Sequence, residues 1–208
     1  MSVKKAYDSW SEQYDTNNNK TRDLEALALQ QTLSNITFDS CLEVGCGTGK
    51  NTVWLLSKAS HITAVDLSAK MLAKAKQKIK SDKINFIQAD ILQDWNFINL
   101  KYNLVSFSLV LEHIENLEPI FNKITKIITT GGHVYIGELH PFKQYSGSKA
   151  RFTTDEGEQV VSSFNHQISD FIQAAKKYGF SIENINEYFD DDRTTIPRIL
   201  SMLFKSAK

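Results

Sequence analysis

The stretch CLEVGCGTGKNT, residues 41–52, places three glycines within five positions directly after a short apolar run. Glycine allows a tight turn and lets the backbone approach a ligand closely. Two nucleotide-binding motifs do not match: a P-loop needs glycine at Val44, and a GxGxxG fingerprint starting at Gly45 needs glycine at Lys50. The stretch therefore predicts a strand that ends near the acid Glu43, followed by a glycine-rich turn that faces a ligand.

Apolar runs of strand length alternate with amphipathic runs of helical length along most of the chain. We expect strands at 40–44, 61–66, 84–90, 102–111, 133–139, 181–189 and 198–207. We expect helices at 21–33, 49–59, 68–80, 117–129 and 166–180, with Ser68 capping the third and Gly131–Gly132 ending the fourth. The alternation predicts an α/β fold with a doubly wound, mainly parallel sheet, and the last two strands predict an antiparallel edge hairpin.

Composition and charge narrow the classes of protein. The 208 residues include 24 Lys or Arg and 24 Asp or Glu, so the formal net charge is zero, which does not favour nucleic acid as a partner. No apolar stretch follows the lysines near the N-terminus, so we expect no signal peptide, no membrane span and a cytoplasmic location. The spacing of Cys41 and Cys46 fits neither a zinc site nor a redox pair, and we expect both to be reduced and half-buried.

Each of the first five expected strands ends at or near an acid. These acids are Glu43, Asp66, Asp90, Glu112 and Glu138. In an open α/β sheet the ligand lies outside the carboxyl ends of the strands. Carboxylates there repel a pyrophosphate but suit a ligand with fixed positive charge and ribose hydroxyls, such as S-adenosylmethionine. Helix capping or a solvated turn is the alternative role for Glu112 and Glu138.

The segments LEVGCGTGKNT, VDLS, QAD and LVLEHI, in that order, resemble the class I S-adenosylmethionine-dependent methyltransferases, in particular the small bacterial members. The resemblance covers residues 38–138. It implies a Rossmann-like sheet of seven strands in the order 3-2-1-4-5-7-6, with strand 7 antiparallel and helices on both faces. It also implies S-adenosylmethionine as cofactor and S-adenosylhomocysteine as product.

The resemblance further implies which residues bind the cofactor. They are Tyr14, Glu43, Gly45, Cys46, Gly47, Gly49, Asp66, Leu67, Met71, Asp90, Ile91, Ser108 and Leu109. By the same resemblance, Asp66 accepts hydrogen bonds from the ribose hydroxyls and Asp90 accepts one from the adenine amino group. Ser108 and Leu109 meet the methionine part through their backbone, and Tyr14 closes the pocket.

We expect one methyltransferase domain over residues 1–208, divided into four segments. These are an N-terminal helical lid (1–37), a cofactor-binding core (38–139), a long polar insertion on the substrate side (140–166), and a final helix with the edge hairpin (167–208). The insertion shows no clear periodicity, and loops of such length are often functional.

Methyl transfer from a sulfonium is an in-line displacement, so a catalytic base is optional. The candidate catalytic residues are His140, Tyr145 and His113. His140 follows the fifth strand and Tyr145 lies five residues on, whereas packing is the alternative role for His113. Lys143, Lys149 and Arg151 either bind a carboxylate or phosphate on the acceptor or are solvated. We expect no metal site.

The function we expect is methylation of a small molecule, with the O, N or C atom left open. The alternative is a catalytically silent, cofactor-binding regulatory protein of the same fold. An NAD-dependent oxidoreductase is disfavoured by Lys50, and a nucleic-acid methyltransferase by the zero net charge. We expect no nucleic-acid partner, and either a monomer or a homodimer.

Overall fold

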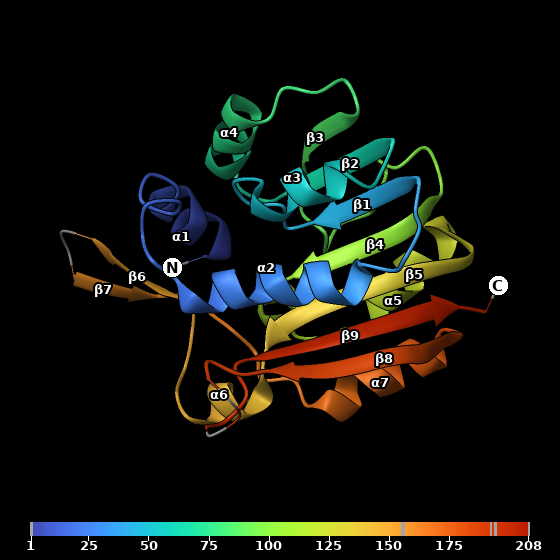
Figure 1. The fold of residues 1–208 in the computed structure, drawn as a ribbon. Coiled ribbons are helices and arrows are strands. Elements are labelled where there is room, and N and C mark those ends of the chain that lie inside the picture. Colours follow the sequence, from blue (N-terminus) through green and yellow to red (C-terminus); the bar gives the residue numbers. More distant parts are fainter. Residues whose placement is uncertain (1, 155–156, 192, 194, 208) are drawn as a thin grey trace.

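A seven-stranded sheet forms the centre of the molecule in the computed structural model, which describes residues 2–154, 157–191, 193 and 195–207. Its strands are β1 (Ser40–Val44), β2 (His61–Asp66), β3 (Ile84–Gln88), β4 (Tyr102–Ser108), β5 (Ile128–Leu139), β8 (Phe180–Tyr188) and β9 (Ile199–Ser206). Their order is β3-β2-β1-β4-β5-β9-β8, with β9 antiparallel to both neighbours and the others parallel (Figure 1). This arrangement confirms the predicted 3-2-1-4-5-7-6 topology.

Helices surround the sheet. They are α1 (Val3–Trp10), α2 (Lys20–Leu33), α3 (Lys50–Leu56), α4 (Ala69–Lys78), α5 (Glu118–Ile127), α6 (Pro141–Tyr145) and α7 (Ile168–Lys177). Successive strand side chains point to opposite faces. Accordingly, Cys41 of β1 packs in one core cluster with Leu29 of α2, while its neighbour Leu42 belongs to a second cluster with Phe121 of α5. The sheet is therefore buried on both sides, as expected for a doubly wound fold.

Helix α1 lies at the carboxyl ends of the parallel strands rather than on a sheet face (Figure 1). Its buried residue Trp10 stacks on Phe152, with the ring centroids 5.2 Å apart, in a small separate cluster. Phe152 belongs to a hairpin formed by β6 (Arg151–Thr154) and β7 (Gly157–Val160). The N-terminal segment and the hairpin thus meet over the edge of the sheet at which a Rossmann-like fold binds its ligand.

Several predicted boundaries are wrong. The third strand ends at Gln88 rather than at Asp90, and the fourth ends at Ser108, so that Glu112 lies in a short 3-10 helix, η1 (Leu111–His113). Helix α5 ends at Ile127, before Gly131–Gly132, because β5 begins at Ile128. Helix–strand boundaries within a continuous apolar run carry little periodic signal, which explains these errors.

The 140–166 segment is more regular than its composition indicated. It holds α6 and the β6–β7 hairpin, since a few apolar residues such as Phe152 and Val161 are buried within a mostly polar stretch.

Cys41 and Cys46 are free thiols, as expected, but both are buried, at 0% and 6% exposed, rather than half-buried. Within the described ranges, no helix combines the length and apolar composition needed to cross a bilayer.

Candidate functional site

The glycine-rich turn after β1 is held in a left-handed backbone conformation. Gly45, Gly47 and Gly49 have φ values of +74°, +54° and +84°. A Cβ on Gly45 would lie 2.1 Å from Cγ2 of Val110, and one on Gly49 would lie 2.6 Å from Cδ1 of Ile79. A Cβ on Gly47 would meet only the Tyr14 ring, at 4.0 Å. Packing therefore requires the outer two glycines, whereas the middle one borders open space.

Asp66, at the end of β2, links the glycine-rich turn to the turn that follows β2. Its Oδ2 accepts a hydrogen bond from the Gly47 amide and its Oδ1 accepts one from the Ser68 amide, both at 2.8 Å. Burial is the largest influence on this carboxyl and raises its pKa to about 6. Ser68 caps α4 as predicted, because its hydroxyl accepts from the Met71 amide.

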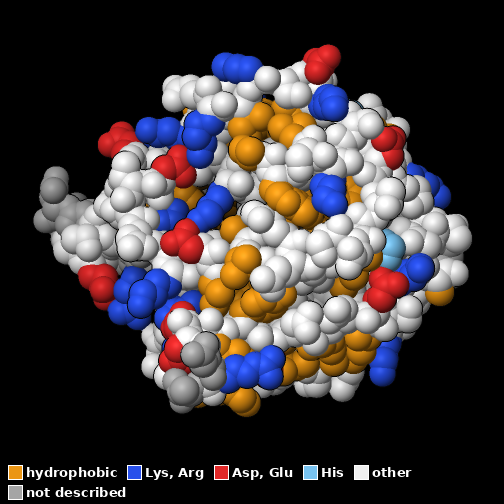
Figure 2. All heavy atoms as spheres, viewed as in Figure 1, with side chains coloured by type: hydrophobic (Ala, Val, Ile, Leu, Met, Phe, Trp, Pro, Cys, Tyr) orange, Lys and Arg blue, Asp and Glu red, His pale blue; other side chains and the backbone are white. Residues whose placement is uncertain are grey.

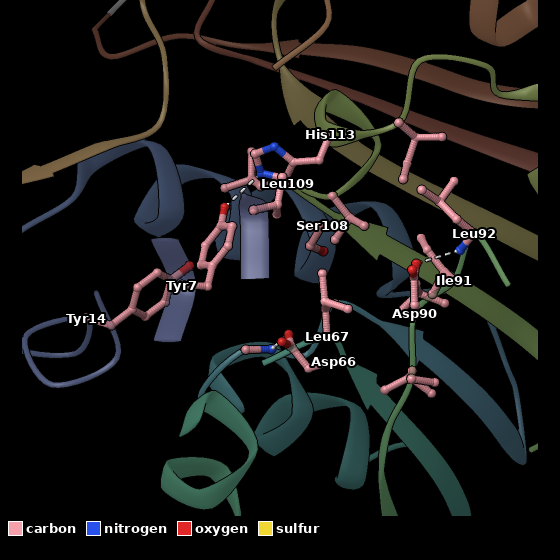
Figure 3. Close-up of a pocket in the computed structure, with 18 residues that line it drawn as sticks. Tyr7, Tyr14, Asp66, Leu67, Asp90, Ile91, Leu92, Ser108, Leu109 and His113 are labelled. Atoms are coloured by element: carbon pink, nitrogen blue, oxygen red, sulfur yellow. Dashed lines mark hydrogen bonds between the residues drawn. The ribbon is translucent and has the colours of Figure 1, made fainter. Parts of the chain in front are cut away.

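An open cavity lies beside Asp66, and we call it the Asp66 cavity (Figure 3). Its walls include ten of the residues predicted from sequence: Tyr14, Gly45, Gly47, Asp66, Leu67, Asp90, Ile91, Ser108, Leu109 and His113. Asp90 stands across the cavity and accepts a hydrogen bond from the Leu92 amide at 2.9 Å.

Four of the predicted cofactor residues lie outside the Asp66 cavity. Met71 is buried in α4, and Gly49 precedes α3. Glu43 is buried beneath the turn and accepts a hydrogen bond from the Thr52 hydroxyl at 2.6 Å; its burial raises its pKa to about 8. Glu43 and Cys46 line a second, smaller cavity on the other side of the turn.

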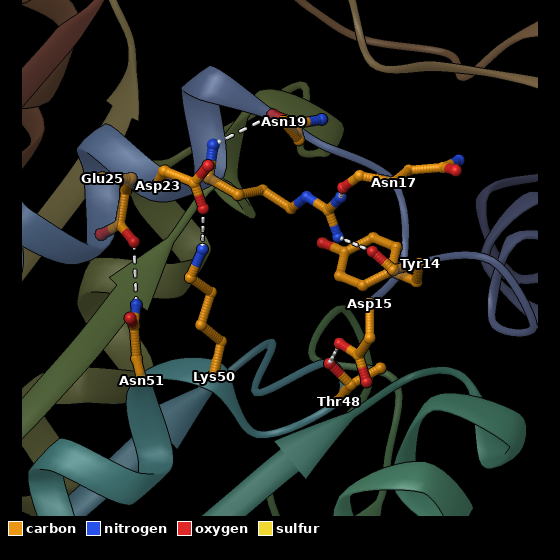
Figure 4. Close-up of polar contacts among 10 residues, drawn as sticks. Tyr14, Asp15, Asn17, Asn19, Asp23, Glu25, Thr48, Lys50 and Asn51 are labelled. Atoms are coloured by element: carbon orange, nitrogen blue, oxygen red, sulfur yellow. Dashed lines mark hydrogen bonds and ion pairs between the residues drawn. The ribbon is translucent and has the colours of Figure 1, made fainter.

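This second cavity, the Glu25 cavity, is polar and is also lined by Arg22, Glu25, Lys50 and Asn51 (Figure 4). The Glu25 carboxylate accepts hydrogen bonds from Asn51 Nδ2 at 2.8 Å and the Tyr135 hydroxyl at 3.1 Å, and burial raises its pKa to about 7. The Arg22 guanidinium stacks 3.9 Å from the centroid of the Tyr14 ring.

Arg22 and Glu25 were not among the residues predicted from the sequence. A signal for Glu25 was present, because Glu25, Leu29 and Leu33 follow one another at intervals of four on one face of α2. An acid within an otherwise apolar helical stripe is a candidate for a buried polar role.

A third cavity, the Trp10 cavity, lies between α1, the start of α2 and the segment 146–151. Its walls are Tyr7, Trp10, Tyr14, Asn19, Thr21, Arg22, Leu109, Glu112, Leu139, residues 146–151 and Arg198. Tyr14 and Leu109 line all three cavities. The three cavities therefore converge at these two side chains.

Three contacts fix the N-terminal segment over the strand ends. The Tyr7 hydroxyl lies 2.9 Å from Nε2 of His113, the Ser68 hydroxyl donates to Asp8 at 2.6 Å, and the Thr48 hydroxyl donates to Asp15 at 2.5 Å. The second His113 nitrogen, Nδ1, lies 2.8 Å from the Ser162 carbonyl. Burial lowers the pKa of His113, so the neutral ring is favoured.

The other two predicted catalytic residues lie outside these cavities. His140 is fully buried: its Nδ1 accepts a hydrogen bond from the Phe142 amide, capping α6, and its Nε2 meets Glu187 at 3.0 Å. The Tyr145 side chain is 64% exposed on α6, and its hydroxyl is bonded to Gln167. The structure thus brings His113 to the Asp66 cavity, but neither His140 nor Tyr145. In the described part of the chain, no group of three or more His, Cys, Asp or Glu side chains could hold a metal ion.

A Rossmann-like sheet with a glycine turn after β1 and an acid at the end of β2 defines the class of nucleotide-cofactor proteins. Residues 42–136 match the family model of a methyltransferase domain. An uncharacterized methyltransferase of Emericella nidulans is 25% identical over 224 residues, covering 87% of this chain and 76% of the relative. A malonyl-[acyl-carrier protein] O-methyltransferase of Priestia megaterium is 27% identical over 159 residues, covering 71% of this chain but only 57% of the relative.

Solved structures of other proteins have the same fold as this chain. An S-adenosylmethionine-dependent methyltransferase from Clostridium acetobutylicum has a TM-score of 0.72 at 17% identity, covering 96% of this chain and 97% of that one. The N-methyltransferase NodS from Bradyrhizobium japonicum, solved with S-adenosyl-L-homocysteine, has a TM-score of 0.72 at 17% identity, covering 98% and 100%. The match over residues 42–136 identifies a methyltransferase domain, and the fold of the whole chain is the fold of S-adenosylmethionine-dependent methyltransferases.

Proposed function

We propose that this methyltransferase acts on a small molecule bound in the Trp10 cavity. The nucleoside of S-adenosylmethionine occupies the Asp66 cavity and its methionine end occupies the Glu25 cavity. The observation that carries this proposal is the meeting of all three cavities at Tyr14 and Leu109. A sulfonium placed there has its nucleoside, its amino-acid end and a methyl acceptor in three separate spaces.

The residues around the Asp66 cavity fit the nucleoside. The space beside Gly47 that a side chain would fill is open. The backbone there can therefore lie directly against the ligand. The Asp66 carboxylate accepts from the ribose hydroxyls, and Asp90 accepts from the adenine amino group. Leu67 and Ile91, both part of this lining, lie against the faces of the adenine.

The remaining predicted cofactor residues act on the methionine end or support the turn. Ser108 ends β4 and Leu109 follows it, and both line the Asp66 and Glu25 cavities. Glu25 supplies a carboxyl for the ammonium group of the methionine end. Cys46 borders the same space, while Glu43, Gly49 and Met71 hold the turn and its flanking helices from beneath.

The bound cofactor supplies an electrophilic methyl group, and the chain must align an acceptor with it and exclude water. Tyr7 and Tyr14 separate the Trp10 cavity from the Asp66 cavity and contribute to both. The segments 1–37 and 140–166 supply most of the Trp10 cavity walls, so we assign them the lid and substrate-side roles predicted from sequence.

Glu112 is a better candidate than His140 or Tyr145 for a group that contacts the acceptor. It lines the Trp10 cavity, it is 5% exposed, and its Oε2 has no hydrogen-bond partner. Burial raises its pKa to about 7, which suits a carboxyl that exchanges a proton near neutral pH. His113 is less suited, because its two ring nitrogens are engaged by Tyr7 and Ser162.

The test is a methyl-transfer assay with radiolabelled S-adenosylmethionine and pooled small acids, amines, alcohols and phenols, set beside DNA, tRNA and protein pools. We expect transfer to a small-molecule pool, and we expect Glu112→Gln to lose turnover while keeping cofactor affinity. The exposed Glu12→Gln variant is the matched control. Transfer to a macromolecular pool alone would refute the proposal, and cofactor binding without transfer to any pool would favour the silent regulatory alternative.

A further inference from the structure

We propose that the methyl acceptor carries an oxyanion group, of the carboxylate or phosphate type, that binds in the Trp10 cavity against Trp10, Arg22 and Lys149. This inference rests on the proposed function, because it takes the Trp10 cavity as the acceptor site. It concerns the chemical class of the acceptor.

Basic side chains from three separate segments face this cavity. Arg22 comes from α2, Lys149 and Arg151 from the end of the α6–β6 loop and the start of β6, and Arg198 from the position before β9. Glu112 is the single acid among the described lining residues. On the face shown in Figure 2, Lys and Arg side chains gather between the β6–β7 hairpin and α6. Such a cavity attracts an anion and disfavours an acceptor with an ammonium group.

Two of the four cations already have acidic partners. Arg198 forms a two-pronged pair with Asp190, both contacts at 2.5 Å, and Arg151 lies 3.3 Å from Glu158. Lys149, in contrast, has no ion pair or hydrogen bond with any described residue and is exposed. Lys143, which the sequence grouped with Lys149 and Arg151, pairs instead with Asp190 at 3.7 Å and is absent from the lining.

Two N–H groups of this cavity's lining residues also lack partners. Trp10 is 4% exposed, and its indole Nε1 is buried with no hydrogen-bond acceptor. The Nε of Arg22 is likewise buried without an acceptor, although its other nitrogens donate to the backbone oxygens of Tyr14 and Asn17. A buried donor left unpaired costs about 1–3 kcal/mol.

An oxyanion would suit both the basic side chains and the unpaired N–H groups of this cavity. It offers several acceptor oxygens, and hydrogen bonds to a charged oxygen are stronger than bonds between neutral groups. The indole of Trp10 and the Nε of Arg22 supply buried donors, and Lys149 supplies a positive charge from the exposed side. Glu112 supplies a hydrogen-bond donor when its carboxyl is protonated.

The experiment uses tryptophan indole NMR signals of the full chain loaded with S-adenosylhomocysteine. Inorganic phosphate and malonate are titrated in separate arms at constant ionic strength, and tetramethylammonium is the cationic control. We expect a saturable shift of the Trp10 signal, assigned with Trp10→Phe, in at least one oxyanion arm and none with the cation. The Trp95 signal is an internal control, because its indole already donates to the Ile91 carbonyl at 2.9 Å.

Variants test the assignment to this cavity. Lys149→Gln should weaken oxyanion binding about fivefold, the effect typical of a partly exposed ion pair. Lys101→Gln, an exposed lysine beside the start of β4, should leave it unchanged. The inference is overturned if neither oxyanion shifts Trp10, or if Lys149→Gln binds like the parent, while S-adenosylhomocysteine still binds. Loss of S-adenosylhomocysteine binding by the parent would instead contradict the proposed function itself.

Discussion

The Tyr7 hydroxyl and Nε2 of His113 lie 2.9 Å apart and join the N-terminal helix α1 to the η1 turn after β4. The direction of this bond follows from the other ring nitrogen. His113 Nδ1 faces the Ser162 carbonyl, which can only accept, so Nδ1 carries the hydrogen and Nε2 accepts from Tyr7. His113 therefore connects the η1 turn to α1 and to the segment around Ser162. Such contacts suit the packing role, which was the alternative to catalysis for this residue.

Removing this hydroxyl should loosen the packing of α1. We expect Tyr7→Phe to cost about 1 kcal/mol locally, the usual net value of one hydrogen bond, and to speed amide hydrogen exchange across α1. Tyr145→Phe, which removes an exposed hydroxyl contact on α6, is the control. Unchanged exchange in α1 would show that the Tyr7–His113 contact does not hold α1.

Gly47→Ala should separate ligand binding from folding. Its Cβ meets only the Tyr14 ring, at 4.0 Å, so we expect a modest stability cost of about 1 kcal/mol from the left-handed backbone. The new methyl group borders the Asp66 cavity, and cofactor affinity should fall at least tenfold by calorimetry. Gly131→Ala has nearly the same constraint, with φ of +71° and no atom within 4 Å, and should lose stability but not affinity.

Gly45→Ala should damage the fold itself. Its Cβ would lie 2.1 Å from Cγ2 of Val110, so overpacking of about 1–3 kcal/mol adds to the backbone cost. Urea unfolding should show a larger loss than for Gly131→Ala. Val110→Ala should recover part of the loss in the Gly45→Ala background but not in the Gly131→Ala background. Equal losses for the two glycine variants would contradict the contact.

Buried acids should make the protein less stable as the pH rises. Burial raises the pKa of Glu43 to about 8 from an ordinary value of 4.5. The native state then holds a proton that the unfolded chain has released, so the free energy of unfolding falls as the pH rises from about 4.5 to about 8. Glu43→Gln should flatten this dependence in urea titrations, and Glu12→Gln should not. Parallel profiles for the parent and Glu43→Gln would rule out this role for Glu43.

The core of the fold was predictable because its signals are local and repeated. The β1 and β2 runs, the Ser68 cap and the buried stripe of α4 all follow from period and capping chemistry, and the structure shows them at the predicted positions. The ends of β3 and β4 were misplaced, since apolar and acidic residues continue past the last ladder position into the loops.

The proposed acceptor site was less predictable because its contacts join distant parts of the chain. His140 follows a strand end, as a site residue often does, yet the chain turns into α6 there and buries the ring against Phe142 and Glu187. Trp10, Arg22 and Glu112 come from three segments whose convergence has no periodic signature. Their proximity depends on the placement of α1, which the Tyr7–His113 and Asp8–Ser68 contacts fix.

Calorimetric titration with S-adenosylmethionine and S-adenosylhomocysteine, using Asp66→Asn, tests the central claim most directly. Asp66 holds the glycine turn through Gly47, and the proposed function assigns it to the ribose hydroxyls. We expect micromolar binding by the parent and by the exposed control Asp82→Asn, and a loss of at least tenfold in Asp66→Asn with the fold retained by circular dichroism. Equal affinity of Asp66→Asn and the parent would contradict the assignment of the Asp66 cavity to the cofactor.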